Sequence, residues 1–194
     1  MENRTNVIPR TFDQVSSILE ELGYVEGEKL SNKGVSLTRI YAESDLLLTE
    51  MIYQDLFAAT SPADLVGLLS GLIFEGRGER SKIPRIPKSL ENPVKACISA
   101  WSKLVYLEEN VGLNPQREPN FDLAWSSYRW ANGNSLHSIL RETEIPVGDF
   151  VRNMRQIIDL LGQLISARSE LATLAREAIK RIDRGVVAYS AVIA

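Results

Sequence analysis

The sequence is poor in the residues from which metal and disulfide sites are built. Its 194 residues include a single cysteine, Cys97, and a single histidine, His137. One cysteine cannot form an internal disulfide, and zinc sites need clusters of cysteine and histidine. This cysteine usage is typical of a reducing compartment. We therefore expect a cytoplasmic protein without a metal site.

Long apolar runs are also missing. No run approaches the roughly 20 residues of a transmembrane helix, and the N-terminus lacks the charged-then-apolar pattern of a signal peptide. We expect no membrane contact. Hydrophobic residues make up 44% of the chain and charged residues 24%, which is typical of a globular domain with a substantial core.

The sequence lacks the motifs of common catalytic sites. It has no Gly-x-x-x-x-Gly-Lys-Ser/Thr phosphate loop, no Gly-x-Gly-x-x-Gly motif, and no Glu-x-x-His pair for a di-metal centre. No motif provides His137 with a serine or cysteine partner. Glu43, Asp45, Glu50 and Glu75 could form an acid–base set, but capping of helix ends explains most of them. We predict no catalytic residues in this chain.

The charge is unevenly distributed. The net charge is −3, but residues 1–76 hold 5 Lys/Arg against 12 Asp/Glu, and residues 77–194 hold 17 against 13. Indiscriminate binding to nucleic acid requires clustered cations that displace counterions, so any such contact here must be local. The acidic first part is expected to be a solvated or partner-facing surface.

Hydrophobic periodicity predicts a mainly α fold, a multi-helix bundle with a small N-terminal β-hairpin. A helix from Phe12 ends at Gly23, and residues 24–40 are predicted to form the hairpin with its turn at 31–34. Together, 12–43 look like the end of a winged-helix module. Residues 1–11 are expected to be disordered or foreign to the natural chain.

Residues 44–194 are predicted to form the bundle. Ser61, Pro62 and Asp64 give a strong helix start, and the apolar residues that follow predict a central, buried helix. Gly67 and Gly71 would let a neighbouring helix approach closely. Further helices are expected at about 46–57, 93–109, 121–131, 135–142, 149–167 and 170–184.

A basic connector at 76–92 interrupts this pattern. Its prolines and glycines predict a loop, and between Arg77 and Lys88 it contains five cations against one acid. It could be a solvated linker, or a basic strap near nucleic acid. The cations are Arg77, Arg80, Lys82, Arg85 and Lys88.

The helix at 149–167 carries an apolar stripe along its whole length. Asp149 suits its start, and the opposite face is expected to show Arg152, Asn153, Arg155, Gln156 and Asp159. With the preceding helix and turn it could form a helix-turn-helix, with the two arginines directed toward a major groove. The long apolar stripe and the acidic composition favour a strut within a bundle instead.

Six ordered blocks of the sequence lie at 40–50, 61–65, 69–75, 130–136, 148–152 and 184–187. They resemble the DSHCT domain, the C-terminal domain of superkiller/DOB/HelY-type DExH-box RNA helicases, and look most similar to the bacterial HelY-like branch. The resemblance covers nearly the whole chain from about Phe12, although residues 76–120 match only loosely.

The resemblance implies a C-terminal accessory domain of an ATP-dependent RNA helicase, with a ratchet-like helix at 149–167 that lines a single-strand channel. The family's arginine contacts would fall on Arg152 and Arg155. Gln156 stands where eukaryotic relatives carry a cation, which would weaken a contact there. Glu75 would face the channel, and Arg77 follows it in the connector.

The implied partners are single-stranded RNA, with DNA left open, and the RecA-like motor and winged-helix domains of the same helicase. ATP and Mg²⁺ would bind only to those motor domains, so no cofactor is expected in this chain. Two other functions stay open. One is a helix-turn-helix DNA-binding regulator, and the other is a structural docking module whose arginines form only salt bridges.

Overall fold

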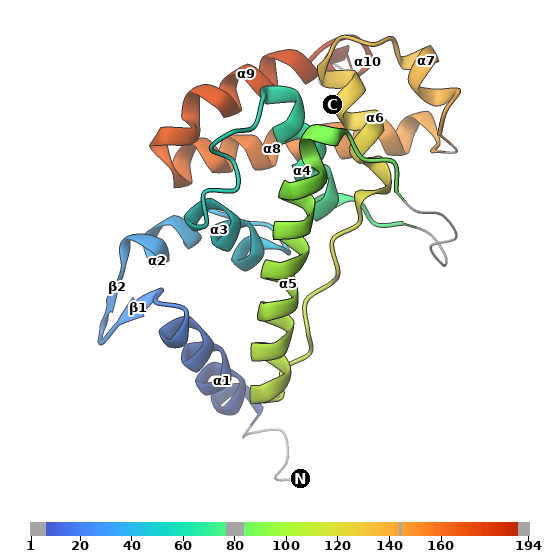
Figure 1. Cartoon of the computed structure of the whole chain (residues 1–194). Coiled ribbons are helices and arrows are strands. Elements are labelled where there is room, and N and C mark those ends of the chain that lie inside the picture. The colour runs from blue at the N-terminus through green and yellow to red at the C-terminus, as the bar shows by residue number, and fades with distance from the viewer. Residues whose placement is uncertain (1–6, 77–83, 144, 190–194) are drawn as a thin grey trace.

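The computed structural model describes residues 7–76, 84–143 and 145–189, and within them the chain is mainly α with one small hairpin, as predicted (Figure 1). The elements in chain order are α1 (Val7–Glu21), β1 (Val25–Glu26), β2 (Lys29–Leu30), α2 (Asn32–Leu37), α3 (Asp45–Tyr53), α4 (Pro62–Ile73), η1 (Lys88–Leu90), α5 (Glu91–Val111), η2 (Phe121–Leu123), α6 (Ala124–Ala131), α7 (Leu136–Leu140), α8 (Val147–Ala167), η3 (Ser169–Leu171), α9 (Ala172–Ile182) and α10 (Val186–Tyr189).

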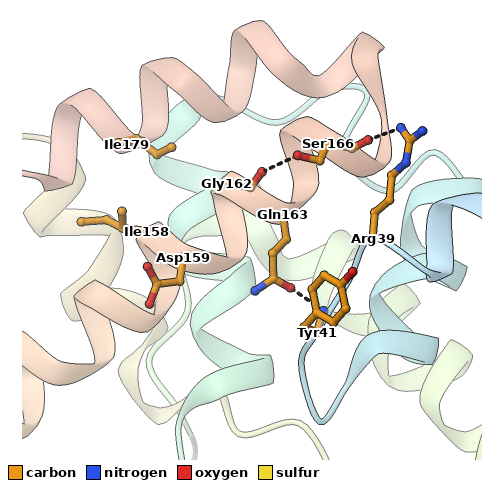
Figure 2. A pocket seen from close by; sticks show the side chains of 8 residues that line it. All are labelled: Arg39, Tyr41, Ile158, Asp159, Gly162, Gln163, Ser166 and Ile179. Carbon is orange, nitrogen blue, oxygen red and sulfur yellow. Dashed lines mark hydrogen bonds between the residues drawn. The ribbon is translucent and has the colours of Figure 1, made fainter.

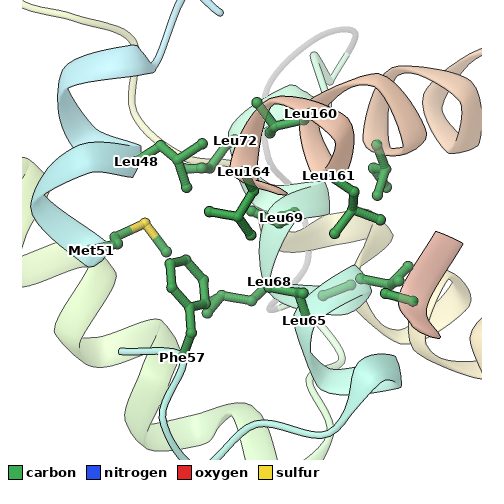
Figure 3. Packing of buried hydrophobic residues seen from close by; sticks show 14 of the residues in the cluster. Leu48, Met51, Phe57, Leu65, Leu68, Leu69, Leu72, Leu160, Leu161 and Leu164 are labelled. Atoms are coloured by element: carbon green, nitrogen blue, oxygen red, sulfur yellow. The ribbon is translucent and has the colours of Figure 1, made fainter. Parts of the chain in front are cut away.

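Helix α4 lies at the centre of the core, as its sequence predicts. Ser61 and Asp64 form a capping box, in which each side chain bonds the other residue's backbone N–H. All its residues from Ala63 to Leu72 are buried. Figure 3 shows leucines of α8 packed beside those of α4, with Met51 and Phe57 closing the cluster. Burial on every side explains why the α4 sequence shows little amphipathic alternation.

The two α4 glycines lie at close contacts with η1, η2 and α6. A Cβ atom on Gly67 would lie 2.8 Å from Leu90 Cδ1, and one on Gly71 would lie 2.2 Å from Phe121 Cε1. The predicted role of these glycines in close packing is confirmed. They let the segment around Phe121 approach α4 closely enough for Asn120 N to donate to Gly71 O at 2.8 Å.

The hairpin is shorter than predicted, and its turn lies elsewhere. β1 and β2 pair antiparallel around Gly27, which has φ of 64°. The predicted turn at 31–34 is instead the start of α2, where the Ser31 side chain accepts from Gly34 N. A Cβ on Gly34 would lie 2.2 Å from Tyr24 O, so this glycine serves a close approach.

Two further predictions need correction near the chain start and in the connector. Residues 1–11 are predicted to be disordered or foreign to the natural chain, but residues 7–11 are ordered in α1, and residues 1–6 lie outside the described residues. The predicted loop at 76–92 ends early, because η1 and the first turn of α5 occupy 88–92. Among the described residues, no helix is long and apolar enough to span a membrane.

The buried thiol of Cys97 should make the protein less stable at alkaline pH. Burial raises the pKa of Cys97 from 9.0 to about 12. The unfolded chain therefore loses this proton from about pH 9 upward while the folded chain keeps it, so stability falls with rising pH. We expect a loss of about 1 kcal/mol between pH 9 and pH 10 from this group.

Urea unfolding of the protein and of Cys97→Ala at pH 8, 9 and 10 measures this contribution. The alanine variant lacks the thiol, so its stability should fall less steeply across the same interval. Equal slopes for the two proteins would contradict the prediction.

Candidate nucleic-acid interface

Helix α8 is anchored along one side and exposed along the other. Phe150, Met154, Ile157 and Leu161 are buried in the core, as the apolar stripe predicts. Five residues at i, i+4, i+7, i+11 and i+14 share the opposite side and are exposed or half-buried. We call them the α8 stripe: Arg152, Gln156, Asp159, Gln163 and Ser166.

Asn153 does not lie on the exposed side, contrary to the prediction. It is 4% exposed, and its Nδ2 donates to Asp149 O at 2.8 Å. A bond to the backbone one turn earlier allows this amide to be buried. The helix also begins at Val147 rather than at Asp149.

The two predicted RNA-binding arginines differ in their surroundings. The Arg152 side chain is 63% exposed and pairs with Asp149 at 3.1 Å, an exposed pair that contributes little to stability. Arg155 is half-buried, and its Nε and NH2 both donate to Val187 O at 3.4 Å. Arg155 therefore holds the segment after α9, whereas Arg152 presents its charge to solvent.

Glu75 is exposed directly after α4. Arg117 fixes this end of the helix by donating to Phe74 O at 2.8 Å and to Leu72 O at 3.0 Å. A cation at a helix C-terminus satisfies carbonyls that have no partner within the helix. Among the described residues, no hydrogen bond or ion pair joins Glu75 to the α8 arginines or to Gln156. Arg77 lies outside the described residues.

Sequence reasoning missed Arg117, because it lies in the loosely matching part of the chain. Its partners are more than 40 residues away, so no local motif reveals the contact.

Within the basic connector, Arg85 is held by the protein itself. Its guanidinium lies 4.0 Å from the centre of the Trp125 ring and pairs with Glu142 at 3.2 Å. Glu142 also accepts from Trp125 Nε1 and pairs with Arg129 at 2.6 Å. The Trp125 and Arg129 hydrogen bonds, followed by the arginine charges, lower the pKa of Glu142. Of the two interpretations of the connector, a linker or a basic strap near nucleic acid, these contacts of Arg85 favour the linker.

Two of the blocks that carry the resemblance meet in space. The Arg184 guanidinium lies 3.6 Å from the Trp130 ring centre and donates to Trp130 O at 2.7 Å and to Asn134 O at 2.8 Å. Trp130 Nε1 donates in turn to Ile182 O at 2.9 Å. Burial lowers the pKa of Arg184. These residues join the end of α9 to the α6–α7 turn, which is a structural role.

A family model for the DSHCT (NUC185) domain matches residues 27–190. The chain belongs to the DSHCT family. Similar proteins include the probable helicase HelY of Mycobacterium leprae, which is 32% identical over 96% of this chain and 22% of its own length. The human exosome RNA helicase MTR4 is 28% identical over 88% of this chain and 17% of its own. The mouse superkiller complex protein 2 is 24% identical over 80% and 13%.

This DSHCT domain therefore spans about a fifth or less of the length of these relatives. HelY and MTR4 are named as helicases, and the chain corresponds to one accessory domain of them. Among the described residues, no group of three or more His, Cys, Asp and Glu side chains could hold a metal ion.

Proposed function

We propose that this domain forms part of the wall of a single-strand channel in an ATP-dependent RNA helicase, with the α8 stripe facing the strand. The main support for this proposal is the geometry of α8. One side of the helix packs in the core, and the other side shows a continuous polar stripe. A helix held this rigidly can keep its position while motor domains move around it. The names of the relatives supply the RNA substrate class.

In this function Arg152 would contact the phosphate backbone as an exposed cation. Arg155 would act beside it, although its bond to Val187 O must loosen for direct contact. Glu75, Gln156 and Arg77 remain predicted contacts. ATP and Mg²⁺ would bind to motor domains outside this chain, and the domain would pack on those motor domains and on a winged helix.

Replacing Arg152 and Arg155 together by alanine should uncouple ATP hydrolysis from unwinding in the intact helicase. We expect unwinding of a duplex with a single-stranded tail to fall at least about tenfold, because each charge-assisted hydrogen bond contributes about 1.5–3 kcal/mol. ATP hydrolysis should continue, since its residues lie elsewhere. Unwinding and ATPase rates are measured on the same preparations.

Two controls accompany this experiment. Arg176→Ala removes another exposed cation, from α9, and should leave unwinding unchanged. Thermal unfolding of each variant checks that the domain stays folded. Unwinding by the double variant at the parental rate would contradict the proposal.

A docking module is the second candidate, and the Arg155 contact favours it in one respect. An arginine bonded to Val187 O has a structural partner and needs no nucleic acid to explain it. In that case the Arg152→Ala single variant would leave unwinding intact, and Arg155→Ala would lower the melting temperature of the domain instead. A helix-turn-helix regulator has less support, since α7 has only five residues and one side of α8 packs in the core along its whole length.

A further inference from the structure

A groove of about 700 Å³ lies on the C-terminal half of α8, beyond the predicted arginines (Figure 2). Its apolar lining comes from Ile158 and Gly162 of α8 and Ile179 of α9. Its polar lining includes Asp159 and Gln163 of the α8 stripe. The segment between α2 and α3 contributes Arg39 and Tyr41 to the same groove. An apolar surface with a few convergent polar groups is typical of a small-ligand site.

Two short hydrogen bonds hold the α2–α3 segment against α8. Arg39 NH1 donates to Ser166 O at 2.6 Å, and Tyr41 N donates to Gln163 Oε1 at 2.6 Å. Both bonds leave the Tyr41 ring itself uncommitted, and this side chain is 81% exposed. An aromatic ring so exposed gains little from burial, so packing within the domain does not explain its position.

We propose that this groove is a nucleobase subsite, in which one base of a single strand stacks on Tyr41. Aromatic rings bind bases of any sequence through their faces, and the base edge is then recognised by hydrogen bonds. Asp159 can accept from a base amino or imino group. Gln163 Nε2 can donate to a base carbonyl or ring nitrogen, because the same amide already accepts from Tyr41 through Oε1.

The charges in the groove favour this orientation of the strand. Arg39 is exposed and keeps guanidinium donors beyond the one bonded to Ser166, so it can contact a phosphate. Asp159 would repel a phosphate but suits a base edge. The base therefore points into the groove and the backbone runs past Arg39.

Continuity with the α8 stripe supports a nucleic-acid strand over a protein as the occupant. Arg152, Asp159 and Gln163 lie on one line of the helix, and 11 residues of α-helix span about 16 Å. A strand that crosses Arg152 can reach the groove without changing sides of the helix. The subsite rests on the proposed function and deepens it by naming where a base is held.

The test uses the 194-residue chain and a ten-nucleotide single-stranded RNA that carries one 2-aminopurine, whose fluorescence falls on stacking. Quenching is titrated for the parent, Tyr41→Ala, Tyr41→Phe and Arg152→Ala/Arg155→Ala. Tyr106→Ala is the matched control, because it removes another exposed tyrosine, from α5. Tyr41→Ala should raise the Kd obtained from the quenching titration at least about fivefold. The Kd of Tyr41→Phe should stay within about twofold of the parent's Kd, because phenylalanine keeps the ring.

The outcomes separate the subsite from the proposed function. Loss of quenching in Tyr41→Ala, with recovery in Tyr41→Phe, supports the subsite. Binding that depends on the α8 arginines but not on Tyr41 overturns the subsite and leaves the channel wall standing. Absence of any quenching in the parent also overturns it, while the unwinding experiment still decides the proposed function. Weaker association of Tyr41→Ala with motor domains, at unchanged RNA binding, would assign the groove to protein docking.

Discussion

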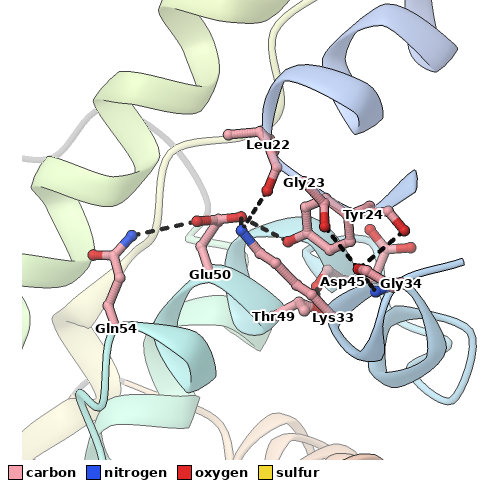
Figure 4. Close-up of polar contacts among 10 residues, drawn as sticks. Leu22, Gly23, Tyr24, Lys33, Gly34, Asp45, Thr49, Glu50 and Gln54 are labelled. Carbon is pink, nitrogen blue, oxygen red and sulfur yellow. Dashed lines mark hydrogen bonds and ion pairs between the residues drawn. The ribbon is translucent and has the colours of Figure 1, made fainter. Parts of the chain in front are cut away.

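Replacing Glu50 by alanine should lower the free energy of unfolding by about 3–5 kcal/mol. Glu50 is 7% exposed on α3, and it is the acceptor on which the N-terminal part of the domain converges. Tyr24 OH donates to Glu50 Oε1 at 2.7 Å, and Lys33 Nζ lies 2.5 Å from the same oxygen (Figure 4). Removing this carboxylate takes a hydrogen-bond acceptor from the buried Tyr24 hydroxyl and the ion-pair partner from the largely buried Lys33 ammonium group.

The other contacts of Lys33 explain why it cannot simply turn to solvent. Its Nζ also donates to Leu22 O at 2.9 Å and lies 4.5 Å from the centre of the Tyr24 ring. The cluster thus joins the end of α1, the start of the hairpin, α2 and α3. We expect its loss to loosen the N-terminal part first.

Urea unfolding of Glu50→Ala, Tyr24→Phe and the double variant measures how much each residue contributes to the free energy of unfolding. Tyr24→Phe alone should cost about 1 kcal/mol, since it removes one hydrogen bond and keeps the ring. The double variant should cost less than the sum, because Glu50→Ala has already removed the hydrogen bond that Tyr24→Phe deletes. A Glu50→Ala loss below 1 kcal/mol would show that water replaces the carboxylate and would refute the prediction.

The predicted elements that the structure confirms are those specified by local chemistry. The start of α4 follows from Ser61, Pro62 and Asp64, which satisfy helix-end N–H groups within one turn. Helix α8 follows from an apolar period repeated for several turns. Neither prediction needs knowledge of distant residues.

The corrected predictions depend on distant or competing contacts. Turn residues occur both at Gly27 and at 31–34, and the sequence does not show that Gly34 must lie against Tyr24 O. A polarity pattern predicts that Asn153 is exposed, because the pattern does not reveal its bond to Asp149 O. The sequence also leaves Glu50 as a possible acid–base residue, because its structural partner Tyr24 lies 26 residues away and no local motif reveals the contact.

The candidate interface also has one part that the sequence predicts and one part that only the folded structure reveals. Arg152, Arg155, Gln156 and Glu75 came from family resemblance, and their contacts with RNA stay predictions. The groove beside them could not be predicted, since Tyr41 bonds to α8 across 122 residues of sequence. Spacing along one helix gives the polar stripe, but only the packed fold brings an aromatic ring to its side.

Substituting alanine for glycine should have opposite effects at two helical positions. In an open helix the change stabilises by about 1 kcal/mol, and Gly162 in α8 has no neighbouring atom within 4 Å of a built Cβ. Gly162→Ala should therefore raise the free energy of unfolding. At Gly71 the same Cβ would lie 2.2–2.7 Å from three atoms of the Phe121 ring, so Gly71→Ala should destabilise the fold by about 2 kcal/mol after the helix gain is subtracted.

The clash at Gly71 cannot be relieved cheaply, because Phe121 is 4% exposed and its segment is tied to α4 by the bond from Asn120 N to Gly71 O. Shrinking the ring should relieve it. Phe121→Leu in the Gly71→Ala background should therefore cost less than in the parent, and urea unfolding of the four proteins gives the coupling. Additive costs would mean that the helix spreads away from η2 instead, and Gly71 would then have no specific role in bringing Phe121 into the core.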